Sequence, residues 1–111
     1  MGERARKTVK VSALFNEDIT DLYEYGEEVF GTVAAKSFVS DIYSRIWSLD
    51  ISYLLHPECR HLATKDKRYR NIIVGSYLII YRILKEEVLV LRILHAHSSI
   101  TKIKNTRRIT F

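Results

Sequence analysis

The sequence predicts an α+β domain in the order β-α-α-β-β-β, with an N-terminal helical hairpin packed on a mostly antiparallel sheet. Three observations predict it. Apolar residues recur at helical spacing between residues 19 and 49, three strand-like runs follow one another closely between residues 69 and 94, and an alternating run precedes the helices. A chain of 111 residues is the size of one domain, so we expect residues 1–111 to form a single domain.

The first strand and first helix are expected at the N-terminal end. The incomplete alternation of apolar and polar residues from Thr8 to Phe15 suits a strand. Asn16 follows as a helix N-cap, and Glu17 and Asp18 put negative charge in the first turn, where the free amides favour it. Gly31 is a natural stop for this helix. The helix presents apolar residues at three- and four-residue spacing: Ile19, Leu22, Tyr23, Gly26, Val29 and Phe30.

A second helix is expected to begin at Thr32. Because almost no loop separates it from the first, the two should form an antiparallel hairpin against the sheet. Residues 50–67 contain the only proline, Pro57, and form the expected connection to the strands. The apolar face of the second helix is a three-four repeat over four turns: Ala35, Phe38, Val39, Ile42, Ile46 and Leu49.

Three strands are expected at residues 69–74, 77–84 and 88–94, which are rich in Tyr, Ile, Val and Leu. A turn at Gly75-Ser76 and a charged connection at residues 85–87 separate them, and such short links favour antiparallel neighbours. Regular alternation in the last strand would place Leu89, Leu91 and Ile93 on one face. It would place Arg92 on the other face, among Val88, Val90 and Leu94.

The charge of +5 favours an acidic partner such as nucleic acid, an anionic protein or a membrane surface, although many domains are mildly basic. Residues 1–7 are expected to be a flexible basic N-terminus. Residues 98–111 are expected to be a basic tail that is either a short helix or an arm ordered only by a partner. The sequence shows neither a secretory signal nor a membrane anchor, and its single cysteine, Cys59, excludes an intramolecular disulfide and suits a reducing cytoplasm.

The strongest candidate for anion binding is a basic cluster around the start of the second predicted strand. Tyr69 lies within it and offers a ring for stacking on a base. The alternative interpretation is a solvated loop, which is somewhat more common for any single member. The cluster consists of Arg60, Lys65, Lys67, Arg68 and Arg70.

His95 and His97 share a strand face, and neither has a cysteine or carboxylate at metal-ligand spacing, so we expect no metal. His97 is the better candidate acid or base because it lies at the strand end, whereas a structural His95 bonded to backbone is expected. Arg82 and Arg92 either bind phosphate or an acidic partner, or cover the sheet and pair with nearby acids.

The sequence resembles the RelE/ParE superfamily of bacterial toxins in the dipeptide His56-Pro57, the block GSYLIIYRI at residues 75–83 and the block VLVLRILH at residues 88–95. The resemblance spans about residues 8–100. These proteins are the toxin halves of type II toxin-antitoxin modules. The resemblance therefore implies a cytoplasmic growth inhibitor of the kind used in plasmid stabilisation, with no cofactor and no membrane partner, held in a hetero-oligomer with a cognate antitoxin.

The superfamily contains two activities, ribosome-dependent cleavage of messenger RNA and inhibition of DNA gyrase. The residues of the nuclease pattern are incomplete here, because Leu78 and Ser98 stand where RelE-type members carry arginine. His97 matches the histidine of a related nuclease branch, but the companion His and Asp of that branch fall on Ile72 and Ser76. The resemblance thus favours a ParE-like gyrase inhibitor. A RelE-like endoribonuclease and a degenerate toxin that only binds antitoxin are the alternatives.

Each activity implies a different use of the candidate residues. In a nuclease, His97 and Arg92 would be catalytic, with the basic cluster at the RNA. In a gyrase inhibitor, Arg82, His95 and the same cluster would contact the target, and the protein would not be an enzyme. In either case Trp47, with Tyr77 and Tyr81 on the sheet, would form the antitoxin groove, and an acidic, amphipathic antitoxin tail would fold there.

Overall fold

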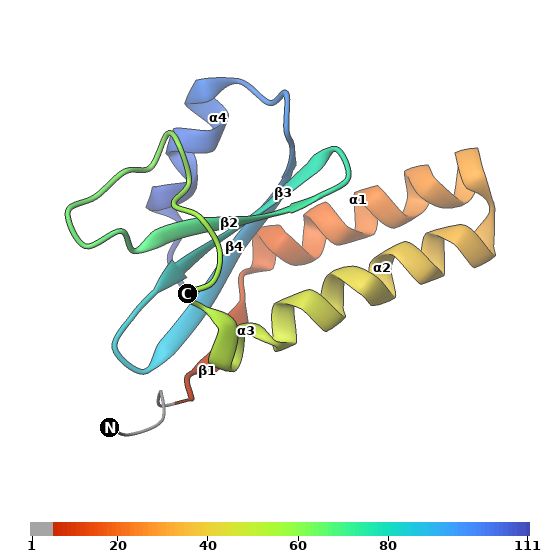
Figure 1. Ribbon diagram of the computed structural model, residues 1–111. Coiled ribbons are helices and arrows are strands. Elements are labelled where there is room, and N and C mark those ends of the chain that lie inside the picture. Colours follow the sequence, from red (N-terminus) through yellow and green to blue (C-terminus); the bar gives the residue numbers. More distant parts are fainter. Residues whose placement is uncertain (1–5) are drawn as a thin grey trace.

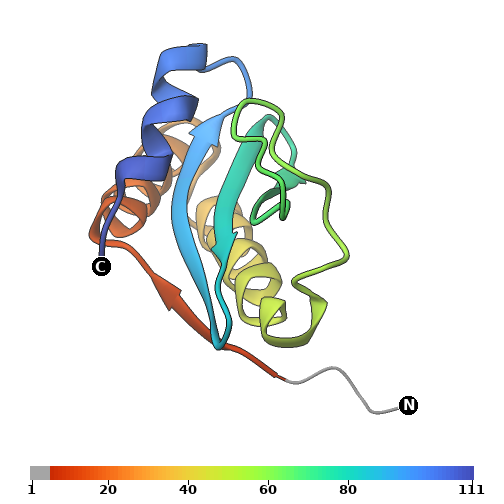
Figure 2. The same ribbon diagram turned by 90° about the vertical axis from the view of Figure 1, so that its left-hand side faces the viewer.

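The computed structural model describes residues 6–111, and in it a helical hairpin covers one face of a four-stranded sheet (Figures 1 and 2). The strand order is β1-β4-β3-β2, with β1 (Thr8–Val11) parallel to β4 (Glu87–His95). The other two pairs, formed by β2 (Tyr69–Val74) and β3 (Tyr77–Ile83), are antiparallel. The predicted α+β class and its mostly antiparallel sheet are confirmed.

Helix α1 (Ala13–Phe30) begins earlier than the sequence predicted. The expected strand to Phe15 and the expected cap at Asn16 are wrong, because β1 ends at Val11 and Ser12 is the N-cap. The buried Ser12 Oγ accepts a hydrogen bond from the Phe15 amide at 2.9 Å and donates one to the carbonyl of Leu91. Ser12 thus caps the helix and at the same time donates a hydrogen bond to the backbone of β4. Asn16 lies one turn further along the helix and makes no such contact with β4.

Gly31, at a φ of +91° that favours glycine, joins α1 directly to α2 (Thr32–Trp47), and a short helix α3 (Leu49–Ser52) follows. The predicted face of the second helix is confirmed, since its residues are buried or packed against the core. Between the hairpin and the sheet lies one apolar cluster: Phe15, Ile19, Ile42, Ile46, Leu49, Tyr53, Ile72, Val74, Ile79, Tyr81, Val88, Val90 and Ile93.

The tip of the hairpin extends past the edge of the sheet (Figure 1). Val29 and Phe30, expected to continue the buried stripe of the first helix, are instead 51% and 70% exposed. The α1 stripe is buried only at its N-terminal end, where Phe15 and Ile19 face the sheet. Large apolar side chains are therefore exposed to solvent at the tip, although their helical spacing predicted that they would be buried in the core.

A β-bulge in β4 changes which side chains face the helices. Tyr81 pairs with Val90 and Ile80 pairs with Arg92, so Leu91 is the extra residue. Val90 and Ile93 therefore both belong to the cluster under the helices, whereas Leu91 and Leu94 belong to the opposite face. The regular alternation expected for residues 88–94 is wrong at this point.

The C-terminal residues cover the second face of the sheet (Figure 2). Helix α4 (Ile100–Asn105) and the 3-10 turn η1 (Thr106–Arg108) carry two buried residues, Ile103 and Thr106. The short-helix form of the predicted tail is therefore the one found, folded on the domain without a partner. The apolar cluster below it comprises Cys59, Leu62, Tyr69, Ile80, Leu89, Leu91, Leu94 and Ile103.

The expected flexible N-terminus, residues 1–7, falls mostly outside the described residues. Within them, Lys7 donates a hydrogen bond from Nζ to the carbonyl of Leu84 at 2.8 Å. Its backbone amide donates to the backbone carbonyl of Asp50 at 2.9 Å. Lys7 is therefore held by the β3–β4 turn. None of the helices in residues 6–111 is long and apolar enough to cross a membrane.

Candidate functional site

Arg92, the predicted phosphate ligand, is bound by a carboxylate of helix α1. Its Nε and Nη2 donate to the two oxygens of Asp18 at 3.0 and 2.6 Å, and Asp18 Oδ2 also accepts the amide of Ile93 at 3.1 Å. Both side chains are largely buried. The hydrogen bonds that Arg92 donates to Asp18 raise the pKa of Arg92. The structure therefore makes Arg92 a brace between β4 and α1, with its Nε–Nη2 edge bound to Asp18 and its charge balanced by that carboxylate.

His95 and His97 lie at the end of β4 with both rings exposed. Their ring centroids are 5.3 Å apart, and the His95 ring meets the edge of Tyr77 at 5.5 Å. His95 Nδ1 accepts the backbone amide of His97 at 3.2 Å, which is the structural role expected for His95. Within residues 6–111 His97 has no hydrogen bond to a carboxylate, the contact that commonly orients an imidazole for acid-base work.

The basic cluster is only partly available for anions. Arg68 is forked onto Asp66, with an Nη2 to Oδ2 distance of 2.7 Å, and this contact lowers the pKa of Asp66 to about 2. Arg70 donates to the carbonyls of Leu54 and His56, which ties β2 to the preceding loop. The remaining members are exposed and are without a hydrogen bond or ion pair from their side chains in the described structure: Arg60, Lys65 and Lys67.

Arg82 holds the C-terminal segment in place. Its Nη2 donates to the carbonyls of Arg107 and Ile109 at 2.9 and 3.2 Å. Its Nε donates to the hydroxyl of Tyr69 at 3.1 Å, with the guanidinium 5.2 Å from the ring centroid. Tyr69 is buried under this contact, so the expected stacking of a base on Tyr69 is wrong, and Arg82 is a structural residue rather than a free cation.

The three residues expected to form an antitoxin groove do not lie on one surface. Tyr81 is fully buried, and its hydroxyl donates to the carbonyl of Tyr53 at 2.8 Å, so it cannot reach a partner. Trp47 is 50% exposed but stacks on Tyr43 in the last turn of α2. Tyr77, by contrast, is half-buried and lies beside Phe38, with ring centroids 6.0 Å apart, at the other end of the hairpin.

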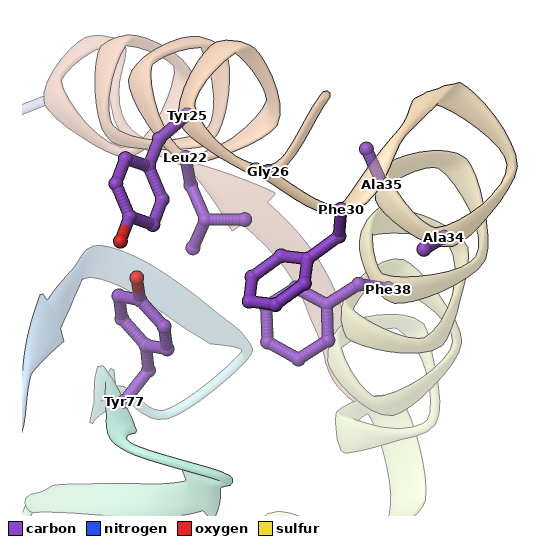
Figure 3. Close-up of a pocket in the computed structure, with 8 residues that line it drawn as sticks. All are labelled: Leu22, Tyr25, Gly26, Phe30, Ala34, Ala35, Phe38 and Tyr77. Carbon is purple, nitrogen blue, oxygen red and sulfur yellow. The ribbon is translucent and has the colours of Figure 1, made fainter. Parts of the chain in front are cut away.

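Tyr77 forms one wall of an apolar pocket of about 290 Å³ between the hairpin tip and the sheet (Figure 3). Sequence reasoning missed this pocket because its residues read as core. One sequence signal could have indicated the pocket: the apolar stripe of α1 extends over a longer helix than the strands beneath it can cover. The lining residues are Leu22, Tyr25, Gly26 and Phe30 from α1, Ala34, Ala35 and Phe38 from α2, and Tyr77 from β3.

A second pocket of about 240 Å³ continues from the first toward the C-terminal end of β4. Leu22, Tyr25 and Tyr77 line both pockets, so the two form one groove. Beyond the shared tyrosines the lining becomes polar and carries both signs of charge, with Asp21 from α1, His95 from β4 and Lys102 from α4. We call the whole surface the hairpin groove.

His56 gives the fold a pH dependence. Burial and, secondarily, the charge of Arg45 lower its pKa below the ordinary value near 6.5, and its ring meets Tyr81 edge-on at 6.2 Å. A lowered pKa means that the folded state binds this proton less readily than the unfolded chain. The free energy of unfolding should therefore fall as the pH is lowered from about 7 to 5, the window just below the unfolded pKa. In urea titrations, His56→Gln should flatten this dependence, and an unchanged slope would contradict it.

A helical hairpin on a sheet of order β1-β4-β3-β2, with a short C-terminal helix on the other face, is the fold of RelE/ParE superfamily toxins. Among residues 6–111 no group of three His, Cys, Asp or Glu side chains is placed to hold a metal ion. A family model described as "ParE toxin of type II toxin-antitoxin system, parDE" matches residues 9–100. The chain belongs to this ParE toxin family.

Two solved structures share the fold. A chromosomal ParDE toxin-antitoxin system of P. aeruginosa aligns with a TM-score of 0.68 and 16% identity, covering 83% of this chain and 98% of that chain. The toxin-antitoxin complex RelBE2 of Mycobacterium tuberculosis aligns with a TM-score of 0.55 and 18% identity, covering 81% and 98%. Comparison with curated protein sequences gives no match.

Proposed function

We propose that this ParE-like toxin acts on DNA gyrase and that it is not itself an enzyme. The observation that carries the proposal is the pairing of Arg92 with Asp18. Metal-free cleavage of RNA needs cations and an acid-base pair that converge on one phosphate. Because Asp18 binds the Nε–Nη2 edge of Arg92 and balances its charge, Arg92 has less charge to offer a phosphate beside His97.

Three further features agree with this proposal. Leu78 leaves β3 without the RelE-type arginine. Arg82 is engaged with the C-terminal carbonyls. The pocket that His95, Ser98 and Lys102 line does not include His97. Together they leave His95 as the titratable side chain recorded in contact with His97, with no paired cation of the RelE-type pattern beside it.

A toxin of this class is neutralised by a cognate antitoxin in a hetero-oligomer, in the cytoplasm where gyrase works. We place the antitoxin contact in the hairpin groove, because Phe30 and Tyr25 leave large apolar surface exposed there. Three exposed cations of the basic cluster are proposed to contact the target: Arg60, Lys65 and Lys67.

The proposal is tested with the purified toxin in two parallel assays, supercoiling of plasmid by DNA gyrase and cleavage of messenger RNA on ribosomes. The toxin should inhibit supercoiling and leave the transcript intact, and His97→Ala should inhibit as well as the wild type does. Transcript cleavage that His97→Ala abolishes would establish the endoribonuclease instead. If neither assay responds while antitoxin is still bound, the chain is a degenerate toxin.

A further inference from the structure

The sheet separates two layers of opposite charge. On one side lie the hairpin and α3, residues 13–52, which contain eight carboxylates and two cations. On the other side lie the loop at residues 56–68 and the C-terminal segment at residues 96–111, which together contain eight cations and two carboxylates. Leu62 of the loop and Ile103 of α4 belong to the same apolar cluster, so the two segments cover the same face of the sheet (Figure 2). We call these two segments the basic layer.

Most cations of the basic layer are not neutralised within the fold. Its two carboxylates are already engaged, because Glu58 accepts the amide of Thr64 and Asp66 binds Arg68. Like charges three and four residues apart on a helix repel each other, and the C-terminal segment retains several at these spacings. Within residues 6–111, seven cations of the layer are exposed and have no ion pair or side-chain hydrogen bond: Arg60, Lys65, Lys67, Lys102, Lys104, Arg107 and Arg108.

The loop holds two of these cations, Lys65 and Lys67, on a fixed turn. The Thr64 hydroxyl accepts the amide of Arg68 at 3.1 Å and donates to Asp66 at 2.9 Å. Lys67 has a φ of +53°, a left-handed conformation that favours glycine and costs free energy in a lysine. A turn that is already ordered loses little conformational entropy when its exposed cations bind a ligand.

The composition of the basic layer decides which class of anion it suits. No large apolar side chain is exposed in residues 56–68 or 101–110. Protein interfaces have a core that is depleted in charged residues, whereas DNA interfaces are more polar and much more positively charged. Tyr69, the aromatic ring within the basic cluster, is buried, so it offers no platform on which an unpaired base could stack. The layer therefore suits the phosphates of a duplex better than a protein surface or a single strand.

We propose that the basic layer binds the phosphate backbone of double-stranded DNA without reading its sequence. This inference rests on the proposed action on gyrase, whose substrate is duplex DNA. The toxin then reaches gyrase through the DNA that the enzyme holds, and the target contact of Arg60, Lys65 and Lys67 is a contact with that DNA. The carboxylates of the hairpin layer are repelled by phosphate, so this layer faces away from the duplex and fixes the orientation of the toxin.

The test measures the affinity of the purified toxin for short fluorescein-labelled duplexes of different sequence by fluorescence anisotropy. Lys65→Gln and Lys104→Gln remove one charge from each segment. Each should weaken binding about 3- to 10-fold at ~0.1 M salt and reduce the slope of log affinity against log salt by about one, the contribution of one phosphate contact. Lys36→Gln removes the same charge from an exposed position of α2 and should change affinity less than about 2-fold.

Inhibition of gyrase supercoiling by the same variants separates this inference from the proposed function. The double variant of Lys65→Gln with Lys104→Gln should inhibit only at several times the wild-type concentration. Variants that bind DNA as the wild type does would overturn the inference, and reduced inhibition in that case would assign the layer to the protein surface of gyrase. Reduced DNA affinity with unchanged inhibition would also contradict it, because the layer would then play no part on gyrase.

Two further results have distinct meanings. If the variants lose DNA affinity as expected but the wild type does not inhibit gyrase, the DNA contact stands and the proposed function is wrong. A strong preference of the wild type for one duplex sequence would contradict binding through the backbone alone.

Discussion

Asp18→Ala should lower the free energy of unfolding by about 3 kcal/mol or more, the range found when one partner of a buried ion pair is removed. The side chains of Arg92 and Asp18 are only 19% and 12% exposed, so the change would leave a charged guanidinium without its partner. It would also leave the amide of Ile93 without its acceptor, at the edge of β4 beyond the end of β1. Urea unfolding of the wild type and the variant measures the loss.

The exposed pair of Arg45 and Asp41 supplies the matched control. It has a similar contact distance, 3.0 Å, but both side chains are about half exposed. Asp41→Ala should therefore cost at most about 0.5 kcal/mol. Replacing both buried partners, as in Asp18→Leu with Arg92→Met, should recover much of the stability lost in Asp18→Ala. If the two single alanine variants lose equal stability, the role of Arg92 as a brace is wrong.

Ile103→Ala should lower the free energy of unfolding by about 2 to 4 kcal/mol, the cost of emptying a buried isoleucine site. Ile103 is 4% exposed and is the apolar contact that α4 makes with the cluster of Ile80, Leu91 and Leu94. Loss of this contact should also make the C-terminal segment more mobile, including the part whose two carbonyls, of Arg107 and Ile109, accept hydrogen bonds from Arg82. Faster amide exchange in residues 100–109 is therefore expected together with the lower unfolding midpoint.

Ile100→Ala on the same helix is the control for this change, because Ile100 is 53% exposed. It removes the same atoms from the same short helix but should cost less than about 1 kcal/mol, since little area leaves the core. Equal losses in the two variants would mean that α4 is not packed on the sheet as described.

The elements that the sequence predicted well are those whose pattern is local. The apolar face from Ala35 in α2 to Leu49 in α3 carries a complete helical pattern and is found. The three strands between Tyr69 and His95 are also found, although the bulge at Leu91 interrupts the alternation of the last one. The start of α1 was misplaced because Ser12 and Asn16 are equally good caps by residue type. The choice is made by the carbonyl of Leu91, a contact across 79 residues that no local pattern contains.

The candidate site depended on three-dimensional features that a sequence hides. The bulge at Leu91 is defined by how β4 pairs with β3, which the sequence of one strand does not show. The predicted neighbours of Arg92 were therefore wrong. A stripe at helical spacing cannot reveal how far a hairpin extends past its sheet, so the exposure of Phe30 was missed. Net charge averages over the chain and therefore conceals that residues 13–30 contain six carboxylates and no lysine or arginine.

The measurement that tests the central claim most directly is controlled expression of the toxin in a bacterium, with messenger-RNA cleavage and DNA synthesis followed in the same culture. If the toxin acts on gyrase, DNA replication should stop and double-strand breaks should appear while transcripts remain intact. Rapid cleavage of transcripts with intact DNA and continued replication would contradict it, and would return the catalytic role to His97.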